Sequence, residues 1–140
     1  MFDPLEAGIV RQGLIAVRHV DRNPPVLTYP PGTFWHGQPS LLPKGLFVEG
    51  LNDPRVNPCA DLELERAWNH TQHWHWIVTA PMPYRILLAL EEFGGVLEGT
   101  QPELATLICV SLDSWKRGVA HYKTLHKICR AGIGVGLTAK

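Results

Sequence analysis

The sequence lacks the features of a disulfide-bonded or membrane-spanning protein. Its three cysteines are an odd number and form no Cys-x-x-Cys pair, which argues against a disulfide framework. No apolar run approaches the roughly 20 residues that cross a bilayer, and the N-terminus does not have the basic and then apolar layout of a signal peptide. We therefore expect a cytoplasmic protein that has no membrane partner.

Motifs for catalysis are also missing from the sequence. There is no Gly-x-Ser-x-Gly element, no glycine loop that would hold a phosphate, and no pair of carboxylates in an obviously buried setting. We therefore expect a protein that is not an enzyme and that uses no cofactor.

Charge is balanced overall but unevenly distributed. The 140 residues contain 13 basic and 13 acidic side chains, so the net charge gives no general attraction to nucleic acid. From residue 100 onward, six basic residues face two acidic ones, an excess of +4. Such an asymmetry indicates a part that faces nucleic acid, although a solvated basic helix would show it too.

The N-terminal segment fits two secondary structures. Asp3-Pro-Leu-Glu6 has the signature of a capping box and predicts a helix over residues 4–20. Against this helix, the segment contains two glycines and five β-branched residues, which equally suit a pair of strands that turns near Gly13.

Residues 24–58 form a proline-rich arm. Eight of the twelve prolines lie here, which excludes a regular helix and a central strand over most of the span. Short strands are expected at Val26–Tyr29 and Leu46–Glu49. Phe34 and Trp35 would be wasted on a mobile linker, so the arm either packs on its own domain or wraps around a partner.

Two helices are expected after the arm, over residues 61–78 and 83–93, and Gly94-Gly95 ends the second. The first helix contains His70, His73 and His75, which are either metal ligands or residues at the edge of an interface or core. Because a third ligand cannot be placed, we expect no metal site. With the histidines, Trp68, Trp74 and Trp76 form a surface suited to being covered by a partner.

Residues 101–121 have the pattern of a short helix, a tight turn and a second helix. A second capping box, Thr100-Gln-Pro-Glu103, begins the first helix, and Ser111 can cap the second. Lys116 and Arg117 face away from the apolar residues, which recur at Leu104, Leu107, Ile108, Val110, Trp115 and Val119.

This stretch resembles the helix-turn-helix unit of DNA-binding proteins, whose second helix enters the major groove. Ala105 occupies the small position at which the two helices cross. Two positions differ from the usual pattern: the turn has Cys109 in place of Gly, and the second helix has Gly118 where an aliphatic residue is favoured. The alternative is an ordinary pair of core helices joined by a short turn.

The resemblance implies a DNA-binding surface on the second helix and at the start of the first. Arg117 would be the best candidate for a bidentate contact to guanine, and amides near Gln101 could bind phosphate. The implied DNA-binding residues are Gln101, Ser111, Leu112, Asp113, Lys116, Arg117, His121 and Lys123.

The sequence thus predicts a mainly α fold. Residues 1–60 would form a helix or hairpin and the proline-rich arm, residues 61–132 a helical domain with a trihelical C-terminal unit (helices 83–93, 101–109 and 112–130), and residues 133–140 a flexible tail. The expected function is a small transcriptional regulator that binds double-stranded DNA as a homodimer or within a larger complex. The alternative is a non-enzymatic interaction protein, a subunit or inhibitor of a larger complex, that uses its aromatic and proline-rich surface, with Phe34, Trp35, Trp68, Trp74 and Trp76 as partner-binding residues.

Overall fold

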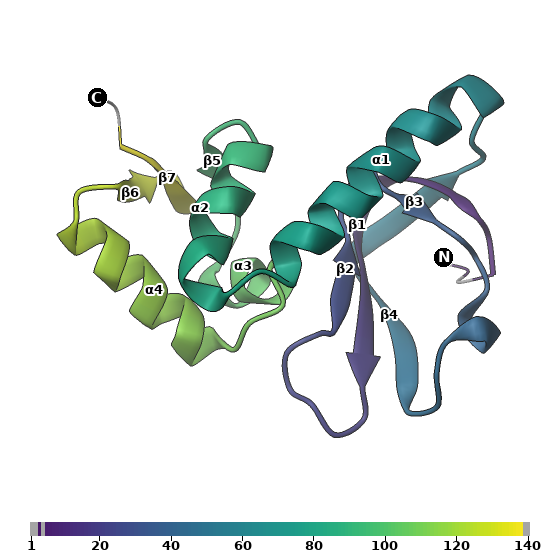
Figure 1. The fold of residues 1–140 in the computed structure, drawn as a ribbon, viewed down its shortest axis with the longest axis horizontal. Helices are drawn as coiled ribbons and strands as arrows, with labels where there is room; N and C mark the ends of the chain where they lie inside the picture. The colour runs from purple at the N-terminus through teal and green to yellow at the C-terminus, as the bar shows by residue number, and fades with distance from the viewer. Residues whose placement is uncertain (1–2, 4, 139–140) are drawn as a thin grey trace. The chain divides into compact units, whose positions relative to one another are not determined.

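A computed structural model describes residue 3 and residues 5–138, and the chain divides into two compact units, Met1–His75 and Trp76–Lys140 (Figure 1). The described residues contain a four-stranded sheet, a three-stranded sheet and four α-helices. The prediction of a mainly α fold is therefore wrong, because residues in both halves that were assigned to helix or loop form strands.

The first unit is built around strand β1 (Gly8–His19). This strand pairs antiparallel with β2 (Leu27–Tyr29), β3 (Phe34–Trp35) and β4 (Leu46–Asn57). Of the helix expected over residues 4–20, residue 4 lies outside the described residues, and residues 5–20 contain no helix and no strand pair that turns at Gly13. The β-branched residues instead pack on one long pleated strand, where they are favoured. Asp3 accepts a bond from the amide of Leu5 (2.9 Å), so its turn forms without a helix after it.

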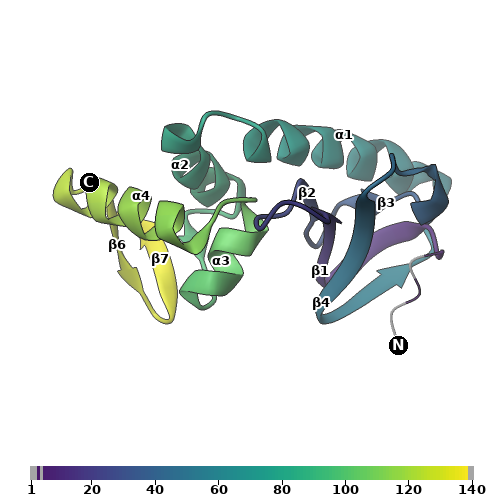
Figure 2. The same cartoon turned by 90° about the horizontal axis from the view of Figure 1, so that it is seen from below.

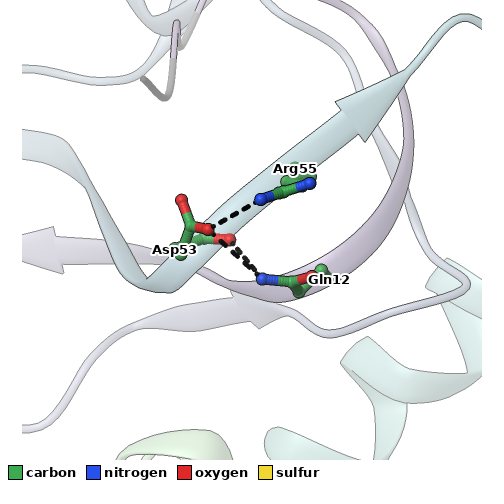
Figure 3. Close-up of polar contacts among 3 residues, drawn as sticks. All are labelled: Gln12, Asp53 and Arg55. Carbon is green, nitrogen blue, oxygen red and sulfur yellow. Dashed lines mark hydrogen bonds and ion pairs between the residues drawn. The ribbon is translucent and has the colours of Figure 1, made fainter.

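Strand β4 includes Pro54 because the ladder is irregular there. The register with β1 shifts on both sides of Gln12, and Asn52 and Asp53 have positive φ angles of 57° and 53°. Figure 3 shows Asp53 between Gln12, whose Nε2 donates to its carbonyl oxygen (3.2 Å), and Arg55, whose guanidinium donates to its carboxylate (3.2 Å). A bulge on an edge strand tolerates a proline, which cannot donate to the ladder.

Helix α1 (Asp61–Val78), which matches the prediction, contributes its residues up to His75 to the first unit and packs along the sheet (Figure 2). Thr71 Oγ1 accepts a bond from the amide of Phe34 (2.7 Å), and Trp74 Nε1 donates to Thr28 Oγ1 (3.1 Å). One cluster of the hydrophobic core consists of Val10, Ile15, Val17, Tyr29 and Trp35. Leu42, which follows the short 3₁₀ helix η1 (Pro39–Leu41), packs against this cluster.

The second unit contains α2 (Met82–Glu92), β5 (Val96–Leu97), α3 (Gln101–Leu107), α4 (Leu112–Thr124), β6 (Ile128–Ala131) and β7 (Gly134–Leu137). The three strands are antiparallel, in the order β5-β7-β6. The helix expected to run to residue 130 ends at Thr124, and the segment 133–140, expected to be flexible, contains strand β7. Among the described residues, no helix has the length and apolar character needed to cross a membrane.

Candidate nucleic-acid interface

Helix α3 begins at the predicted capping box. Thr100 Oγ1 accepts a hydrogen bond from the amide of Glu103 (3.4 Å), and Glu103 Oε1 accepts one from the amide of Thr100 (3.0 Å). Leu104 and Ala105 are buried, whereas Gln101 lies exposed in the first turn. The box fixes where the seven-residue helix starts and which face it buries.

The turn after α3 is closed by two backbone bonds. The amide of Cys109 donates to Thr106 O (3.1 Å) and the amide of Val110 donates to Ala105 O (3.0 Å), which is the pattern of a Schellman motif. Cys109 therefore adopts the left-handed conformation, with φ of 62°, that glycine usually supplies. The departure from the helix-turn-helix pattern is thus one of residue type, because the backbone shape is the usual one.

Helix α4 is capped by Ser111, whose hydroxyl accepts a bond from the amide of Ser114 (3.1 Å). Its buried face consists of Trp115, Val119 and Tyr122. Gly118 faces α2, where a Cβ atom would come within 2.6 Å of Ile86 Cδ1. An aliphatic residue is missing at this position because α2 fills the space.

The opposite face of α4 is polar and exposed. Lys116 and Arg117 both lie on it, with Leu112, Asp113, His121 and Lys123. Arg117 forms an ion pair with Asp113 (3.0 Å), one helical turn before it, and the two side chains are 74% and 78% exposed. An ion pair so exposed holds the guanidinium only weakly, so Arg117 can exchange Asp113 for another acceptor.

A groove beside α4 brings in residues that the sequence reasoning missed. Its volume is about 320 Å³, and its polar lining includes Gln101 from α3, Lys123 from α4 and Arg130 from β6. Trp115 and Val135 are among its apolar residues. The sequence does not place Arg130 in the site because its pattern predicts one helix over residues 112–130, whereas α4 ends at Thr124 and Arg130 lies in β6. Two short runs around Gly132 were the available signal of a hairpin.

The predicted partner residues divide into buried and exposed ones. Trp35 and Trp74 have no exposed surface and belong to the core of the first unit, which corrects their expected place on a partner surface. Trp68 and Trp76 are 48% and 58% exposed. Phe34 is half-buried, with its ring 6.4 Å from that of Trp68 in an edge-on arrangement.

The three histidines of α1 do not form a metal site. Among residue 3 and residues 5–138, no group of three or more His, Cys, Asp or Glu side chains is close enough to hold an ion. The ring of His75 lies edge-on to Tyr29 at 4.7 Å, and its Nε2 lies 3.2 Å from Thr28 O. Because a carbonyl oxygen only accepts, the neutral ring has its proton on Nε2.

Burial shifts the pKa of several of these rings. It lowers the pKa of His75 below its usual range, and the bond to the Thr28 carbonyl opposes this in part. Burial likewise lowers the pKa of His36 and raises that of Tyr29. In α4, burial and the nearby Tyr84 raise the pKa of Tyr122.

Sequence comparisons found no matching family model and no matching curated protein. Solved structures do match over nearly the whole chain. Two CRP/FNR-family transcriptional regulators from Thermus thermophilus give TM-scores of 0.53 and 0.56 at 19% and 17% identity, covering 96% and 99% of this chain and 88% and 85% of theirs.

The c-di-GMP responsive global regulator CLP of Xanthomonas campestris gives a TM-score of 0.53 at 15% identity, over 94% of this chain and 84% of its own. At these identities the likeness concerns the fold. The chain therefore has a fold similar to that of CRP/FNR transcriptional regulators.

Proposed function

We propose that the protein is a transcriptional regulator that binds double-stranded DNA through α3, α4 and the β6–β7 hairpin. The observation that carries the proposal is the exposed basic face of α4, which follows a closed turn in the second unit. The similarity to regulators of the CRP/FNR family supports the same interpretation.

In this proposal α4 enters the major groove with the face that its core residues leave exposed. Arg117 donates to the acceptor edge of a guanine, and Asp113 accepts from a cytosine amino group once their ion pair opens. Ser111 and Leu112, at the start of the helix, lie nearest the bases, although the Ser111 hydroxyl is already engaged as the cap. The DNA backbone is contacted by Gln101, Lys116, His121 and Lys123. Arg130, which lines the protein groove beside α4 together with Gln101 and Lys123, contacts the DNA backbone as well.

The charge of the second unit suits this role. Electrostatic attraction to phosphate supplies much of the affinity for DNA, and it acts locally because salt screens charges over about 8 to 10 Å. The +4 excess after residue 100 is therefore effective even though the whole chain is neutral.

The binding experiment uses a fluorescent duplex that the wild-type protein recovers from a randomised library. Reversing two charges, Lys116→Glu with Arg117→Glu, should weaken binding at least tenfold, since each lost contact is worth about 1 to 3 kcal/mol. The matched control reverses Arg22 and Lys44 in the first unit, both exposed, with the same change in net charge. Equal affinity of the two double variants, both folded by circular dichroism, would refute the interface on α4.

Dimerisation through α1 is part of the proposal, because two-fold regulators place two recognition helices one DNA turn apart. Leu62, Leu64 and Trp68 leave apolar surface exposed on this helix, with Leu62 96% exposed. We expect sedimentation to show a dimer that Trp68→Glu dissociates and that the control Val20→Glu, at an apolar residue 67% exposed, leaves intact. A monomeric wild-type protein would rule the dimer out.

One observation favours the alternative of an interaction protein. A largely apolar groove of about 400 Å³ lies in the second unit, lined by Trp76, Tyr84 and Leu88 among others. If Tyr84→Glu abolished the protein's cellular effect while DNA binding in vitro was retained, a protein partner at this groove would be the better account.

A further inference from the structure

We infer that Arg85 is a positioning residue for DNA binding. It holds the turn between α3 and α4 in place and does not itself contact DNA. Its guanidinium donates from Nε to Ala80 O (2.9 Å) and from Nη1 to Ile108 O (3.3 Å) and Cys109 O (3.1 Å). One side chain thus joins the segment before α2 to the turn. This inference rests on the proposed function.

The carbonyls of Ile108 and Cys109 need such a donor. These two carbonyls lie just beyond Leu107, the last residue of α3, where the partial negative charge of the helix end favours a cation. The Schellman bonds end on the carbonyls of Ala105 and Thr106, whereas the carbonyls of Ile108 and Cys109 accept from Arg85. Arg85 supplies two bonds to them from a half-buried position, where charged hydrogen bonds are stronger than in water.

The conformation of the turn between α3 and α4 requires stabilising contacts. Cys109 has a φ of 62°, which costs a residue other than glycine roughly 1 to 2 kcal/mol. This residue sets the direction in which the chain leaves α3 for Ser111 and the start of α4. If the connection between α3 and α4 opened part of the time, the N-terminal turn of α4 would move. The side chains that contact bases would move with that helix.

Arg85 lies on a different helix from the charged residues that α4 contributes to the proposed interface. It belongs to α2 and binds backbone oxygens of its own unit, whereas Lys116, Arg117 and Lys123 are exposed on α4. Removing it should therefore reduce affinity while leaving the number of phosphate contacts unchanged. The salt dependence of binding measures that number, because each contact adds about 0.9 to the slope of log K against log salt concentration.

The test compares Arg85→Gln with Arg117→Gln on the duplex that the wild-type protein selects. For Arg85→Gln we expect affinity to fall about tenfold, or about 1.4 kcal/mol, with an unchanged salt slope. For Arg117→Gln, whose arginine contacts guanine in the proposed function, specificity should relax at that base pair. A reduced slope in Arg85→Gln would mean that Arg85 contacts DNA, which would overturn the positioning role.

Amide hydrogen exchange tests the turn without DNA. In Arg85→Gln the amides of Cys109 and Val110 should exchange at least several-fold faster, while those of His126 and Lys127, in the similar turn after α4, should not change. Unchanged exchange at Cys109 and Val110 would refute the inference. If Arg85→Gln does not fold, Arg85→Lys replaces it, since lysine keeps the charge but offers one nitrogen in place of the two that donate here.

These measurements separate the inference from the function on which it rests. If the wild-type protein selects no duplex, the proposed function fails, and Arg85 then has no DNA-binding role to serve. If the protein binds DNA and the turn amides are unaffected, the function stands and the role of Arg85 fails.

Discussion

Cys109 has a backbone conformation that its residue type disfavours, in a side-chain environment that suits it. The residue is 5% exposed with a φ of 62°. Replacing it with glycine relieves the backbone and loses a small buried side chain, whereas alanine loses the sulfur and keeps the strain.

We therefore expect Cys109→Gly to be more stable than Cys109→Ala by about 1 kcal/mol, the reverse of the usual order at a buried helical site. Urea unfolding of the two variants measures the difference. An alanine variant as stable as the glycine variant would show that the turn carries no such strain.

His75 should make the stability of the first unit depend on pH. Burial lowers the pKa of His75 in the folded protein, so the unfolded chain binds more protons as the pH falls below about 6.5. Stability should be constant above that pH and decrease as the pH falls through the interval between the unfolded and folded pKa values.

Replacing His75 with glutamine should reduce this loss of stability between pH 7 and pH 5, measured by chemical unfolding at each pH. Part of the dependence should persist, because burial also lowers the pKa of His36. His73→Gln, an exposed change on the same helix, is the control. An identical pH profile for His75→Gln and the wild-type protein would contradict this account.

At the scale of elements, the contact between α2 and α4 depends on the missing side chain of Gly118. A Cβ atom there would lie 2.6 Å from Ile86 Cδ1 and 3.3 Å from Met82 Cε. Alanine gains about 1 kcal/mol in helix propensity over glycine, but overpacking a core costs typically 1 to 3 kcal/mol, and Ile86 is fully buried. The cost of overpacking should therefore exceed the gain in helix propensity.

Gly118→Ala should accordingly destabilise the protein by about 1 kcal/mol, and Ile86→Val, which lacks the clashing Cδ1, should relieve that cost. In a double-mutant cycle the pair should lose less stability than the sum of the single changes. Additive losses, measured by thermal unfolding, would mean that the helices separate freely to admit a methyl group.

The ends of the helices explain which elements could be predicted from the sequence. Helix α2 ends at Glu92 and is followed by Gly94, whose amide donates to Glu91 O; the sequence predicts this end because glycine is the usual residue just after a helix. Helices α3 and α4 end in the same way with Cys109 and His126 in the left-handed conformation. Nothing in the residue type of His126 signals a helix end, so α4 was extended into what is the β6–β7 hairpin.

In the first unit, the short strands expected at Val26–Tyr29 and Leu46–Glu49 match β2 and the start of β4, whereas the sequence leaves β1 undecided between a helix and a strand pair. A local signal, the capping box at Asp3, competed with β-branched residues whose strand preference depends on partners far along the sequence. Strand β1 pairs with residues up to Asn57, and no local pattern shows that pairing. The helix-turn-helix candidate was recognisable because its caps and apolar spacing are all local, whereas Arg85 and Arg130 join it only through tertiary structure.

At the scale of the whole molecule, the two units differ in the kinds of residue that they contain. Tyr29 and Trp35, which DNA binding does not explain, belong to the core of the first unit, the proline-rich residues 24–58 lie in the same unit, and the basic excess lies in the second. In the proposed function, residues beyond 100 contact DNA, and the first unit and α1 serve assembly.

A nitrogen-15 NMR titration of the intact protein with its selected duplex tests this division most directly. We predict that amide shifts change at Gln101, along α4 and in the β6–β7 hairpin, and stay constant in β1 through β4. Changes confined to the first unit, or no change at any amide at low salt, would contradict the claim that the second unit is the DNA-binding surface.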